Sequence, residues 1–493
     1  MTMQLSKTNL SAIHDSGITK PADAIFSLPE KVLQFGTGVL LRGLPDYFID
    51  KANRQGLFNG RVVVVKSTDS GDAAAFDRQD GLYTLCVRGI EDGHKVEENI
   101  ICSAISRVLS ARDQWQEILA LARNPEMQIV ISNTTEVGIQ LVDDDIRREP
   151  PVSFPGKLLA FLYERYKAFG GSPQSGMVIV PTELIVDNGK KLAAIVKELT
   201  QMNALEADFL LWMEKHCSFC SSLVDRIVPG KPDAASLQQL THDLGYTDDL
   251  LAISEVYRLW AIEGDEKVRT VLSFAGADEG VIIAPDIEIY RELKLRLLNG
   301  THTLSCGLAY LAGFGTVKQA MDDAAFSAFV SDLMLKEIAP SIPYDVPLSE
   351  ARDFGLRVLD RFRNPHLQHQ WLSITMQYSS KMKSRDIPVL LRHYQTHSAP
   401  PPYFVLGFAA YLLFMRGEGH PVNDDKAAYF VELWKKPDTL VHAALQDKSL
   451  WGADLTALPG FEEAVQHNLD SLINKGPLAT LAAAGAAVRP LVR

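Results

Sequence analysis

The chain has 493 residues, of which 46% are hydrophobic and 22% charged, and its mean hydropathy is −0.01. This composition is typical of a folded globular protein with about two or three domains, and it excludes a disordered chain. The formal charge of −12 at pH 7 argues against nucleic acid or an anionic membrane as a partner, because both bind basic surfaces. An anionic substrate would therefore need a local cluster of basic residues.

Two features of the sequence bear on where the protein works. The N-terminal segment lacks the charged and then apolar pattern of a secretory signal, and the longest apolar run, residues 404–415, is too short to span a bilayer. The five cysteines are an odd number, which suits reduced thiols. Cys217 and Cys220 could form half of a zinc site or a redox pair, but no second pair of this spacing exists. We therefore expect a cytoplasmic protein whose thiols are mainly structural.

The first chemical motif is a glycine turn near the N-terminus. An apolar strand at residues 31–35 leads into Gly36 and Gly38, and a helix containing Arg42 follows. Glycines let such a turn tighten and let the backbone approach a pyrophosphate. The third glycine of the full dinucleotide motif is absent, because Leu41 stands at its position. The motif is therefore incomplete, but it predicts a dinucleotide site at Gly36, Gly38 and Arg42.

A second apolar strand, residues 61–66, follows at the distance expected of a βαβ unit and leads to Asp69 and Asp72. An acidic side chain at this place would accept hydrogen bonds from the adenosine ribose and repel a 2′-phosphate. The two aspartates therefore favour NAD over NADP, although Lys66 could in principle attract a 2′-phosphate. A solvated loop that merely carries two acids is the alternative.

Two further buried strands also end in polar residues. Residues 127–132 lead to Thr134 and Glu136, and residues 177–181 lead to Asn188. Polar groups at the carboxyl ends of parallel strands face the ligand crevice of an open α/β sheet. We therefore expect Thr134 and Glu136 to contact the cofactor and Asn188 to be an amide donor for an oxyanion.

The strand and helix patterns divide the chain into two parts. Through residue 286, strands alternate with helices, which predicts an α/β fold with a Rossmann-like domain over residues 1–286. From residue 287 helical periodicity dominates, which predicts a mainly helical substrate-binding and catalytic domain over residues 287–493. The helices expected in this second domain span residues 293–311, 323–339, 349–362, 370–382, 403–416 and 426–436.

The first helix of the second domain carries three polar side chains of different chemistry. At about 100° per residue, Asn299 lies roughly 140° and His302 roughly 80° around an α-helix from Lys294, so all three can face one cleft. A lysine in a partly dry pocket can exchange a proton with a hydroxyl, because burial lowers its pKa. An asparagine amide can donate to an alkoxide, and an imidazole can orient the same oxygen. This set predicts interconversion of a carbinol and a carbonyl, although the spacing alone is also compatible with an exposed helix surface.

Four ordered motifs resemble the long-chain polyol dehydrogenase family typified by mannitol 2-dehydrogenase. They are the glycine turn with Arg42 and Gly43, the strand end Thr134–Gly138, the segment Val224–Pro229, and the helix with Lys294, Asn299 and His302. The resemblance extends over nearly the whole chain. Residues 124–136, 218–228 and 361–370 look most like the branch of the family that interconverts D-tagaturonate and D-altronate.

This resemblance implies that Lys294 is the general acid/base, that Asn188 and Asn299 form an oxyanion hole, and that His302 positions the reacting oxygen. The predicted substrate contacts are Asp225 and Lys381. The polyol enzymes place an arginine eight residues before the lysine that matches Lys381, whereas this chain has Ser373 there. The substrate end of the pocket is therefore built differently, which is consistent with a sugar acid.

Residues 379–385 supply three cations in a domain of an acidic protein, and Lys381 is the one we expect to recognise a carboxylate. A solvated basic face is the alternative interpretation of such a run. The expected function is NAD-dependent, metal-independent interconversion of D-tagaturonate and D-altronate in hexuronate catabolism. Within the same class, a fructuronate reductase or a mannitol or other hexitol dehydrogenase is the alternative. The expected partner is a small-molecule sugar acid, with neither nucleic acid nor membrane, and the oligomeric state is left open.

A metal-dependent lyase or epimerase is an alternative from another class. His393 and His397 have the i, i+4 spacing of a metal pair, and His366 and His369 have the i, i+3 spacing. No acidic residue lies between His393 and His397, and the proline-rich segment that follows them indicates a helix end, where histidines are common. A non-catalytic sugar-binding protein is a third alternative, but it would need neither the glycine turn nor the lysine.

Overall fold

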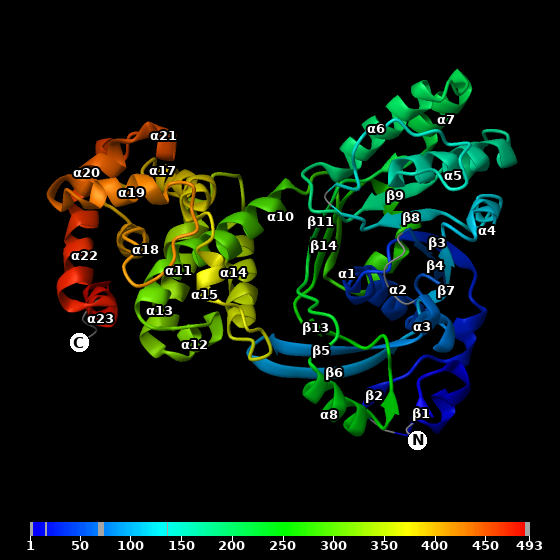
Figure 1. The fold of residues 1–493 in the computed structure, drawn as a ribbon, viewed down its shortest axis with the longest axis horizontal. Helices are drawn as coiled ribbons and strands as arrows, with labels where there is room; N and C mark the ends of the chain where they lie inside the picture. The colour runs from blue at the N-terminus through cyan, green and yellow to red at the C-terminus, as the bar shows by residue number, and fades with distance from the viewer. Residues whose placement is uncertain (1–2, 15–16, 68–72, 136, 489–493) are drawn as a thin grey trace. The chain divides into compact units, whose positions relative to one another are not determined.

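The protein consists of two compact units. The computed structural model describes residues 3–14, 17–67, 73–135 and 137–488. The N-terminal unit is formed by Met1–Arg88 and Lys95–Ile287, and the C-terminal unit by Gly89–His94 and Glu288–Arg493 (Figure 1). The tip of one hairpin, Gly89–His94, thus belongs to the C-terminal unit, although the chain on both sides of it belongs to the N-terminal unit.

A six-stranded parallel sheet forms the centre of the N-terminal unit. Its strands are β3 (Glu30–Phe35), β4 (Arg61–Lys66), β7 (Ile105–Ser110), β8 (Ile129–Ser132), β9 (Val178–Pro181) and β10 (Ser218–Phe219). They lie in the order β10-β9-β8-β3-β4-β7, and each adjacent pair is parallel. The chain starts in the middle at β3, moves outward through β4 and β7, and then returns to β8 and moves outward on the other side. The switch point therefore lies between β3 and β8, where sheets of this kind bind their ligands.

Both faces of this sheet are buried. Successive side chains of a strand point to opposite faces, so Val62 and Val64 of β4 pack into one apolar core while Val63 and Val65 pack into the other. The first core includes α2 (Pro45–Arg54) and the second is covered by α4 (Trp115–Leu121), α5 (Phe154–Phe169), α6 (Asn188–Met202) and α7 (Ala207–His216). Burial on both faces explains why the strands are continuous apolar runs in the sequence.

Smaller sheets and short helices complete the N-terminal unit. A three-stranded sheet contains β11 (Ser222–Asp225), β14 (Leu259–Glu263) and β15 (Val281–Ala284), and a four-stranded sheet contains β13 (Ala252–Glu255), β5 (Tyr83–Glu91), β6 (His94–Cys102) and β2 (Ile18–Thr19). The strand β1 (Met3–Gln4) pairs with β12 (Tyr246–Thr247). The other helices are α1 (Val39–Gly43), α3 (Ala73–Arg78), α8 (Ala234–Leu244) and α9 (Glu266–Val271).

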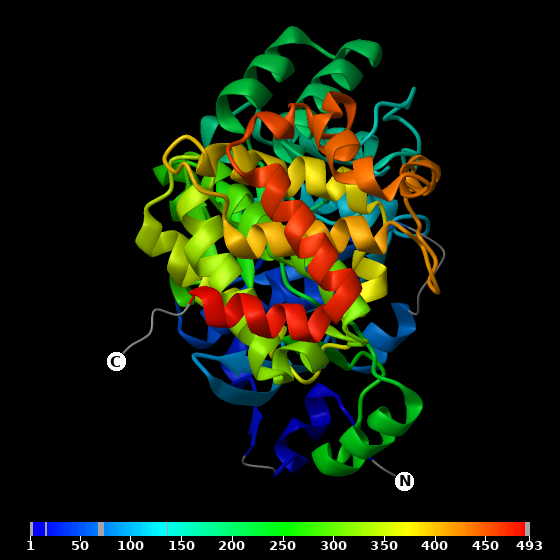
Figure 2. The ribbon, with the colours of Figure 1, turned by 90° about the vertical axis from the view of Figure 1, so that its left-hand side faces the viewer.

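The C-terminal unit is helical (Figure 2). Its α-helices are α10 (Glu288–Leu293), α11 (Thr301–Leu311), α12 (Val317–Asp322), α13 (Ala324–Asp332), α14 (Leu348–Phe362), α15 (Trp371–Ile374), α16 (Tyr378–Lys381), α17 (Ile387–His393), α18 (Pro402–Phe414), α19 (Ala427–Trp434), α20 (Pro437–Gln446), α21 (Lys448–Trp451), α22 (Phe461–Lys475) and α23 (Pro477–Val488). Three π-helical segments, η5 (Lys294–Gly300), η6 (Leu333–Ile338) and η8 (Met382–Asp386), continue α-helices. The apolar helix α18 packs against α11 and α22 and forms the core of the unit.

The predicted fold class, a Rossmann-like α/β part followed by a helical part, is confirmed. The helix expected over residues 370–382 is wrong in one respect, because Gln377 takes a left-handed conformation with φ of 54° and separates α15 from α16. The helix expected over residues 293–311 is not α-helical throughout, because η5 interrupts it. Hydrophobic periodicity carries no signal for either local change.

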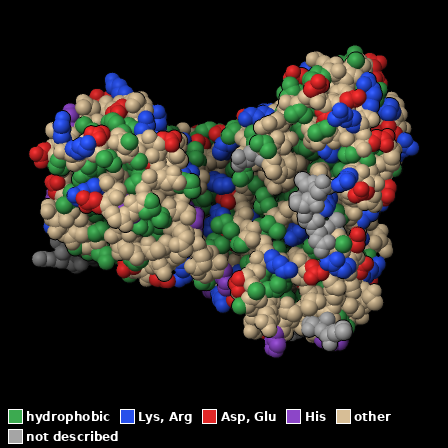
Figure 3. Space-filling model, viewed as in Figure 1, with side chains coloured by type: hydrophobic (Ala, Val, Ile, Leu, Met, Phe, Trp, Pro, Cys, Tyr) green, Lys and Arg blue, Asp and Glu red, His purple; other side chains and the backbone are tan. Residues whose placement is uncertain are grey.

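The surface gives no sign of a single-charge face in the view of Figure 3, where basic and acidic side chains are interspersed on each unit. The apolar run at residues 404–415 lies almost entirely within α18 and is mostly buried inside the C-terminal unit. Among the described residues, we find no helix with the length and apolar character needed to cross a membrane.

Candidate functional site

The glycine turn lies at the switch point of the parallel sheet. Gly36 follows β3, and its amide donates to the carbonyl oxygen of Val65 at 3.1 Å. Its φ of 126° is a conformation that other residues rarely adopt, and an added Cβ would lie 2.8 Å from the carbonyl oxygen of Asn133. Asn133 directly follows β8, so glycine here allows the ends of the two central strands to approach each other.

Gly38 has a different reason to be glycine. It precedes α1, has φ of −64°, and a Cβ added to it would meet no atom within 4 Å. Neither backbone strain nor internal packing therefore requires glycine at this position. The open space beside Gly38 suits the close approach of a diphosphate to the backbone, and the turn thus fits a dinucleotide.

Arg42 braces the turn from within the unit. Its side chain is buried, and its Nη1 donates to the carbonyl oxygen of Thr37 at 3.2 Å. Its guanidinium lies 5.5 Å from the ring centre of Phe76 and 5.7 Å from that of Tyr83. These contacts hold the backbone between the two glycines, so Arg42 acts on the turn directly.

The strand end after β8 is organised by an acid that the sequence interpretation did not assign. The Oε1 of Glu183 accepts hydrogen bonds from the backbone N–H and the hydroxyl of Thr134, at 2.9 and 3.0 Å, and its Oε2 accepts from the Ser132 hydroxyl at 3.1 Å. Glu183 follows β9 at the same sheet edge, and this position is the signal that could have identified it. The other predicted cofactor contacts, Glu136, Asp69 and Asp72, lie outside the described residues.

Asn188 begins α6 and is fully buried. Its Nδ2 lies 3.0 to 3.1 Å from the carbonyl oxygens of Pro181, Glu183 and Ser222, and its Oδ1 accepts from the N–H groups of Gly189 and Ser222. The amide therefore ties the end of β9 to the start of β11. A substrate oxygen would have to compete with these carbonyls for the amide hydrogens.

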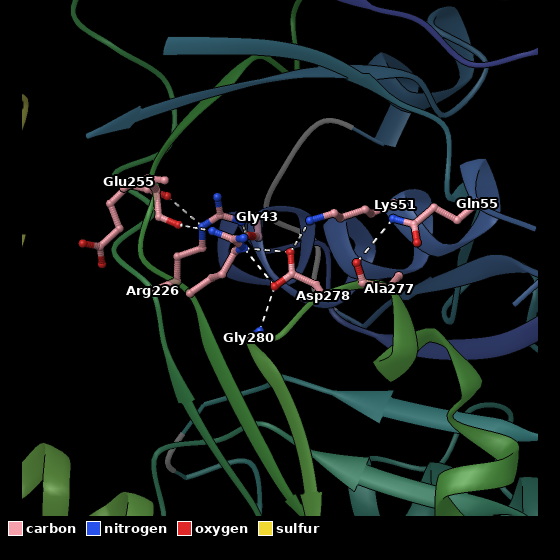
Figure 4. A network of polar contacts seen from close by, with 10 residues as sticks. Gly43, Lys51, Gln55, Arg226, Glu255, Ala277, Asp278 and Gly280 are labelled. Atoms are coloured by element: carbon pink, nitrogen blue, oxygen red, sulfur yellow. Dashed lines mark hydrogen bonds and ion pairs between the residues drawn. The ribbon is translucent and has the colours of Figure 1, made fainter. Parts of the chain in front are cut away.

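Asp225 ends β11 and is 8% exposed. The neighbouring Arg226 is also buried, and it donates to the carbonyl oxygens of Glu255 and Gly43 at 2.9 and 2.6 Å (Figure 4). Its guanidinium lies 4.5 Å from the ring centre of Tyr47, and burial lowers its pKa to about 10. Arg226 thus connects the strand that carries Asp225 to the end of α1.

A second part of the same network fixes α2. The carboxylate of Asp278 accepts from Lys51 of α2 at 2.6 Å, from the Arg258 guanidinium at 2.8 Å and from the N–H of Gly280 at 2.8 Å (Figure 4). Although burial opposes ionisation, these cations and the hydrogen bonds hold the pKa of Asp278 below its usual value. The helices after the glycine turn are therefore anchored to the smaller sheets by charged groups.

In the C-terminal unit, Lys294 and Asn299 lie on the π-helix η5 and are half-buried. On an α-helix, two residues five apart would point roughly 140° away from each other. In a π-helix each N–H bonds to the carbonyl five residues earlier, so residues five apart lie on the same face of the helix. The π-helix therefore brings Lys294 and Asn299 to the same side more closely than the expected α-helix would.

His302 lies in the first turn of α11 and is 8% exposed. Its ring stacks on Phe362 with centres 4.0 Å apart and meets His369 and Trp371 edge-on at 5.1 and 5.8 Å. Burial, together with the positive charge of nearby side chains, holds the pKa of His302 well below its usual value. Its Nε2 has no hydrogen-bond partner among the described residues. The imidazole therefore favours its neutral form, and its Nε2 is a buried nitrogen without a hydrogen bond in the described part of the chain.

Besides burial, four side chains lower the pKa of His302 electrostatically. His369 has the largest effect of these, and three cationic side chains, Arg361, Arg385 and Lys381, follow. Lys381 donates to the carbonyl oxygen of Ile374 at 2.9 Å, which leaves further hydrogens of its ammonium for other acceptors. Burial and the charge of Arg385 lower the pKa of Lys381. These side chains create a positive region around His302, while Ser373 is exposed.

The histidine pairs and the cysteines do not form a metal centre in the described part of the chain, where no three or more His, Cys, Asp or Glu side chains are placed to hold an ion. His393 and His397 stack with ring centres 4.4 Å apart, and His393 Nε2 contacts the carbonyl oxygen of Ala399. Cys217 and Cys220 are both free thiols, and burial raises their pKa values to about 11 and 12. Such thiols are poor nucleophiles.

Comparison with protein families identifies the two units. Residues 30–275 match the mannitol dehydrogenase Rossmann domain, and residues 286–473 match the mannitol dehydrogenase C-terminal domain. The chain belongs to the mannitol dehydrogenase family. It is therefore an oxidoreductase with a Rossmann domain, and the family resemblance found in the sequence is confirmed.

Individual relatives cover nearly the whole chain. The altronate oxidoreductase of Yersinia enterocolitica is 38% identical over 93% of this chain and 97% of its own length, and that of Bacillus subtilis is 38% identical over 91% and 94%. Among solved structures, Pseudomonas fluorescens mannitol 2-dehydrogenase in a ternary complex with NAD and D-mannitol aligns with a TM-score of 0.64. It is 23% identical and covers 99% of this chain and 100% of its own. This structural likeness supports the fold.

Proposed function

We propose that this protein is an NAD-dependent oxidoreductase that interconverts D-tagaturonate and D-altronate without a metal. The observation that carries the proposal is the similarity, at 38% identity over more than nine tenths of the chain, to curated altronate oxidoreductases. The positive region around His302 supports an acidic sugar over an uncharged one, because a carboxylate gains charge-assisted hydrogen bonds there.

The N-terminal unit holds the cofactor in this proposal. Gly36 and Gly38 give the backbone its close approach to the diphosphate, while Arg42 and Thr134 hold the two loops at the switch point. The nicotinamide, when bound, supplies the hydride that adds to the carbonyl carbon of the substrate. The sequence signal for NAD over NADP rests on Asp69 and Asp72, and Glu136 is a further proposed contact.

Lys294 acts as general acid in the direction of reduction. As the carbonyl carbon gains a hydride, its oxygen becomes an alkoxide and takes a proton from the Lys294 ammonium, so that the C=O bond becomes a CH–OH group. Asn299, on the same side of η5, donates to the oxygen while its negative charge develops. In the reverse direction the neutral lysine removes the hydroxyl proton.

His302 orients the reacting oxygen as a neutral donor or acceptor. A neutral imidazole donates from one ring nitrogen and accepts at the other, so it can contact a carbonyl or a hydroxyl without adding charge. The stacked ring of Phe362 fixes the plane of the imidazole. Asn188 is proposed as a second donor that must exchange one backbone carbonyl for the substrate oxygen, and Asp225 as a contact to the sugar hydroxyls.

The substrate carboxylate is assigned to Lys381. Its ammonium is half-buried, and desolvation strengthens a charge-assisted contact. The short side chain of Ser373 leaves room at the position where the polyol enzymes carry an arginine.

A substrate panel tests the proposal directly. Turnover of D-tagaturonate, D-fructuronate and D-fructose is measured with NADH and with NADPH, at the nicotinamide absorbance, and D-altronate is oxidised in the reverse assay. We expect the highest kcat/KM for D-tagaturonate with NADH. A higher value for D-fructuronate would make the protein a fructuronate reductase, a higher value for D-fructose would make it a hexitol dehydrogenase, and a preference for NADPH would overturn the role of the aspartates.

A further inference from the structure

Two π-helical segments of the C-terminal unit pack against each other. One is η5, which carries Lys294 and Asn299, and the other is η8. The carboxylate of Asp386, in η8, comes close to η5 at Gly300, where an added Cβ would lie 2.7 Å from the Oδ1 of Asp386. The absence of a side chain at Gly300 therefore permits this packing.

An arginine side chain from each segment contacts the backbone of the other. The Nη1 of Arg296, in η5, donates to the carbonyl oxygens of Ser384 and Arg385 in η8, at 2.6 and 2.7 Å. The Nη1 of Arg385 lies 3.1 Å from the Oγ1 of Thr303 and 3.5 Å from the carbonyl oxygen of Asn299. The Thr303 hydroxyl in turn donates to the Asn299 carbonyl at 2.8 Å. Arg385 thus holds the backbone of a predicted catalytic residue.

The contacts of Arg296 have a local cause. Pro388 has no backbone N–H, so it cannot donate to the carbonyl of Ser384 four residues earlier, and its ring crowds that carbonyl. The π-helix η8 ends two residues before this proline, and Arg296 supplies a donor to the Ser384 carbonyl. Arg296 is 6% exposed and is itself held by both carboxylate oxygens of Glu292, at 2.9 and 3.2 Å. It is therefore fixed on both sides.

We propose that Arg296 and Arg385 form a reciprocal clamp that holds η5 in its π-helical form and so keeps Lys294 and Asn299 on one side of the helix. The inference rests on the function proposed above for these two residues. Without the clamp, η5 can relax toward an α-helix, in which the two side chains would diverge by roughly 140°. The arginines are positioning residues, because they act on the substrate only through Lys294 and Asn299.

The first test replaces Arg296 with methionine and with lysine. Misplacement of a catalytic group by about 1 Å can cost about 100-fold in rate, so Arg296→Met should lower kcat roughly 10- to 100-fold and change KM less than threefold. Arg296→Lys keeps one cationic donor and should recover part of kcat. NADH affinity, measured by fluorescence titration, should stay unchanged in both. A wild-type kcat in a folded Arg296→Met variant would overturn the clamp. A rise in KM with kcat unchanged would overturn it as well.

A second pair of variants removes the other half of the clamp with little change in volume. Thr303→Val deletes the hydroxyl that Arg385 contacts, and Thr303→Ser keeps it. We expect Thr303→Val to lose about tenfold or more in kcat and Thr303→Ser to remain near wild type. A wild-type kcat in Thr303→Val together with a loss in Thr303→Ser would show that the methyl packing matters and the hydroxyl contact does not, which would overturn the role of Arg385. This pair also decides the question if Arg296→Met does not fold.

Combination with Lys294→Ala separates the clamp from the proposed function. If the arginines act through Lys294, adding Thr303→Val to Lys294→Ala should lower kcat by much less than it does in the wild type. Full additivity of the two losses would overturn the inference. If Lys294→Ala alone retains its activity, the catalytic assignment itself fails, and this outcome is seen before any clamp variant is compared.

Discussion

Asp46 offers a test of the structure that does not depend on the substrate. It lies in the first turn of α2, directly behind the glycine turn, and its side chain is fully buried. Its Oδ2 accepts from the Nε2 of Gln34 at 3.2 Å, and its Oδ1 has no hydrogen-bond partner among the described residues. Burial raises the pKa of Asp46 from 3.8 to about 7, and the hydrogen bond from Gln34 and the charge of Arg42 offset only part of this effect.

The sign of the effect on stability follows from the two protonation equilibria. The folded state keeps the Asp46 proton up to about pH 7, whereas the unfolded chain releases it near pH 3.8. The free energy of unfolding therefore falls as pH rises from about 4 to about 7 and then levels off. A shift of about three pKa units at about 1.36 kcal/mol per unit corresponds to about 4 kcal/mol at pH 8.

The variant Asp46→Asn replaces the titratable carboxyl group with a neutral amide. Its amide oxygen can still accept from Gln34, so we expect the variant to be more stable than the wild type by up to about 4 kcal/mol at pH 8 and by little at pH 4. At roughly 2 °C per kcal/mol, the melting temperature should rise by roughly 8 °C at pH 8. Scanning calorimetry of the full chain at both pH values measures this difference.

Asp278→Asn is the matched control, because the pKa of Asp278 is lowered by Lys51 and Arg258. Its carboxylate contributes stability above its unfolded pKa, and this contribution is lost as pH falls through the lowered value. The control variant should therefore be less stable than the wild type at pH 8, opposite in sign to Asp46→Asn. If Asp46→Asn leaves the pH dependence of stability unchanged, Asp46 is ionised in the folded protein and the argument from burial is refuted.

Three predictions concern catalysis. Lys294→Ala should lower kcat by about 10²- to 10⁴-fold while NADH binding stays near wild type, and a loss below about tenfold would mean that another group transfers the proton. Asn299→Ala should lower kcat more than it raises KM, because its donor matters most when the oxygen is charged; steady-state kinetics showing the reverse would make it a substrate anchor. Lys381→Met should lower kcat/KM for a keto-uronate by roughly 10- to 150-fold and for an uncharged ketose much less. Equal losses on both substrates would leave Arg361 as the next candidate for the carboxylate.

The central sheet could be predicted because its strands carry their burial in the sequence. The valines of β4 are apolar at consecutive positions, and only a strand buried on both faces tolerates this. The hydrophobic pattern could not predict that β3 and β8 lie side by side. The identity of Gly36 reflects this close approach. Strand order depends on which strands pair, and hydrophobic periodicity does not encode pairing.

The π-helix η5 shows a different limit. The spacing of Lys294, Asn299 and His302 identifies a helix with functional side chains, but a calculation at 100° per residue assumes an α-helix. The contacts that accompany the π form come from Ser384 and Arg385, more than eighty residues later in the chain. A local pattern cannot reveal a conformation whose partners are distant in sequence.

Asn188 and Glu183 show why a residue type does not by itself define a role. Both follow β9 at the ligand edge of the sheet. The Asn188 side chain bonds to the backbone around it, and the Glu183 carboxylate accepts from one backbone N–H and two hydroxyls. The sequence interpretation gave Asn188 a catalytic part and gave Glu183 none. Their hydrogen bonds hold the segments after β8 and β9 and the start of β11 in place at this edge.

In the proposed function, the charge around His302 explains how an acidic protein can bind an acidic substrate. A protein with a formal charge of −12 repels a carboxylate at long range, so recognition must come from a short-range positive region. Burial is the main cause that lowers the pKa of His302, and His369 and the cations of this region lower it further. In the proposed function the cations bind the substrate carboxylate. The reacting oxygen contacts the neutral imidazole of His302, whose tautomer decides which ring nitrogen carries the proton.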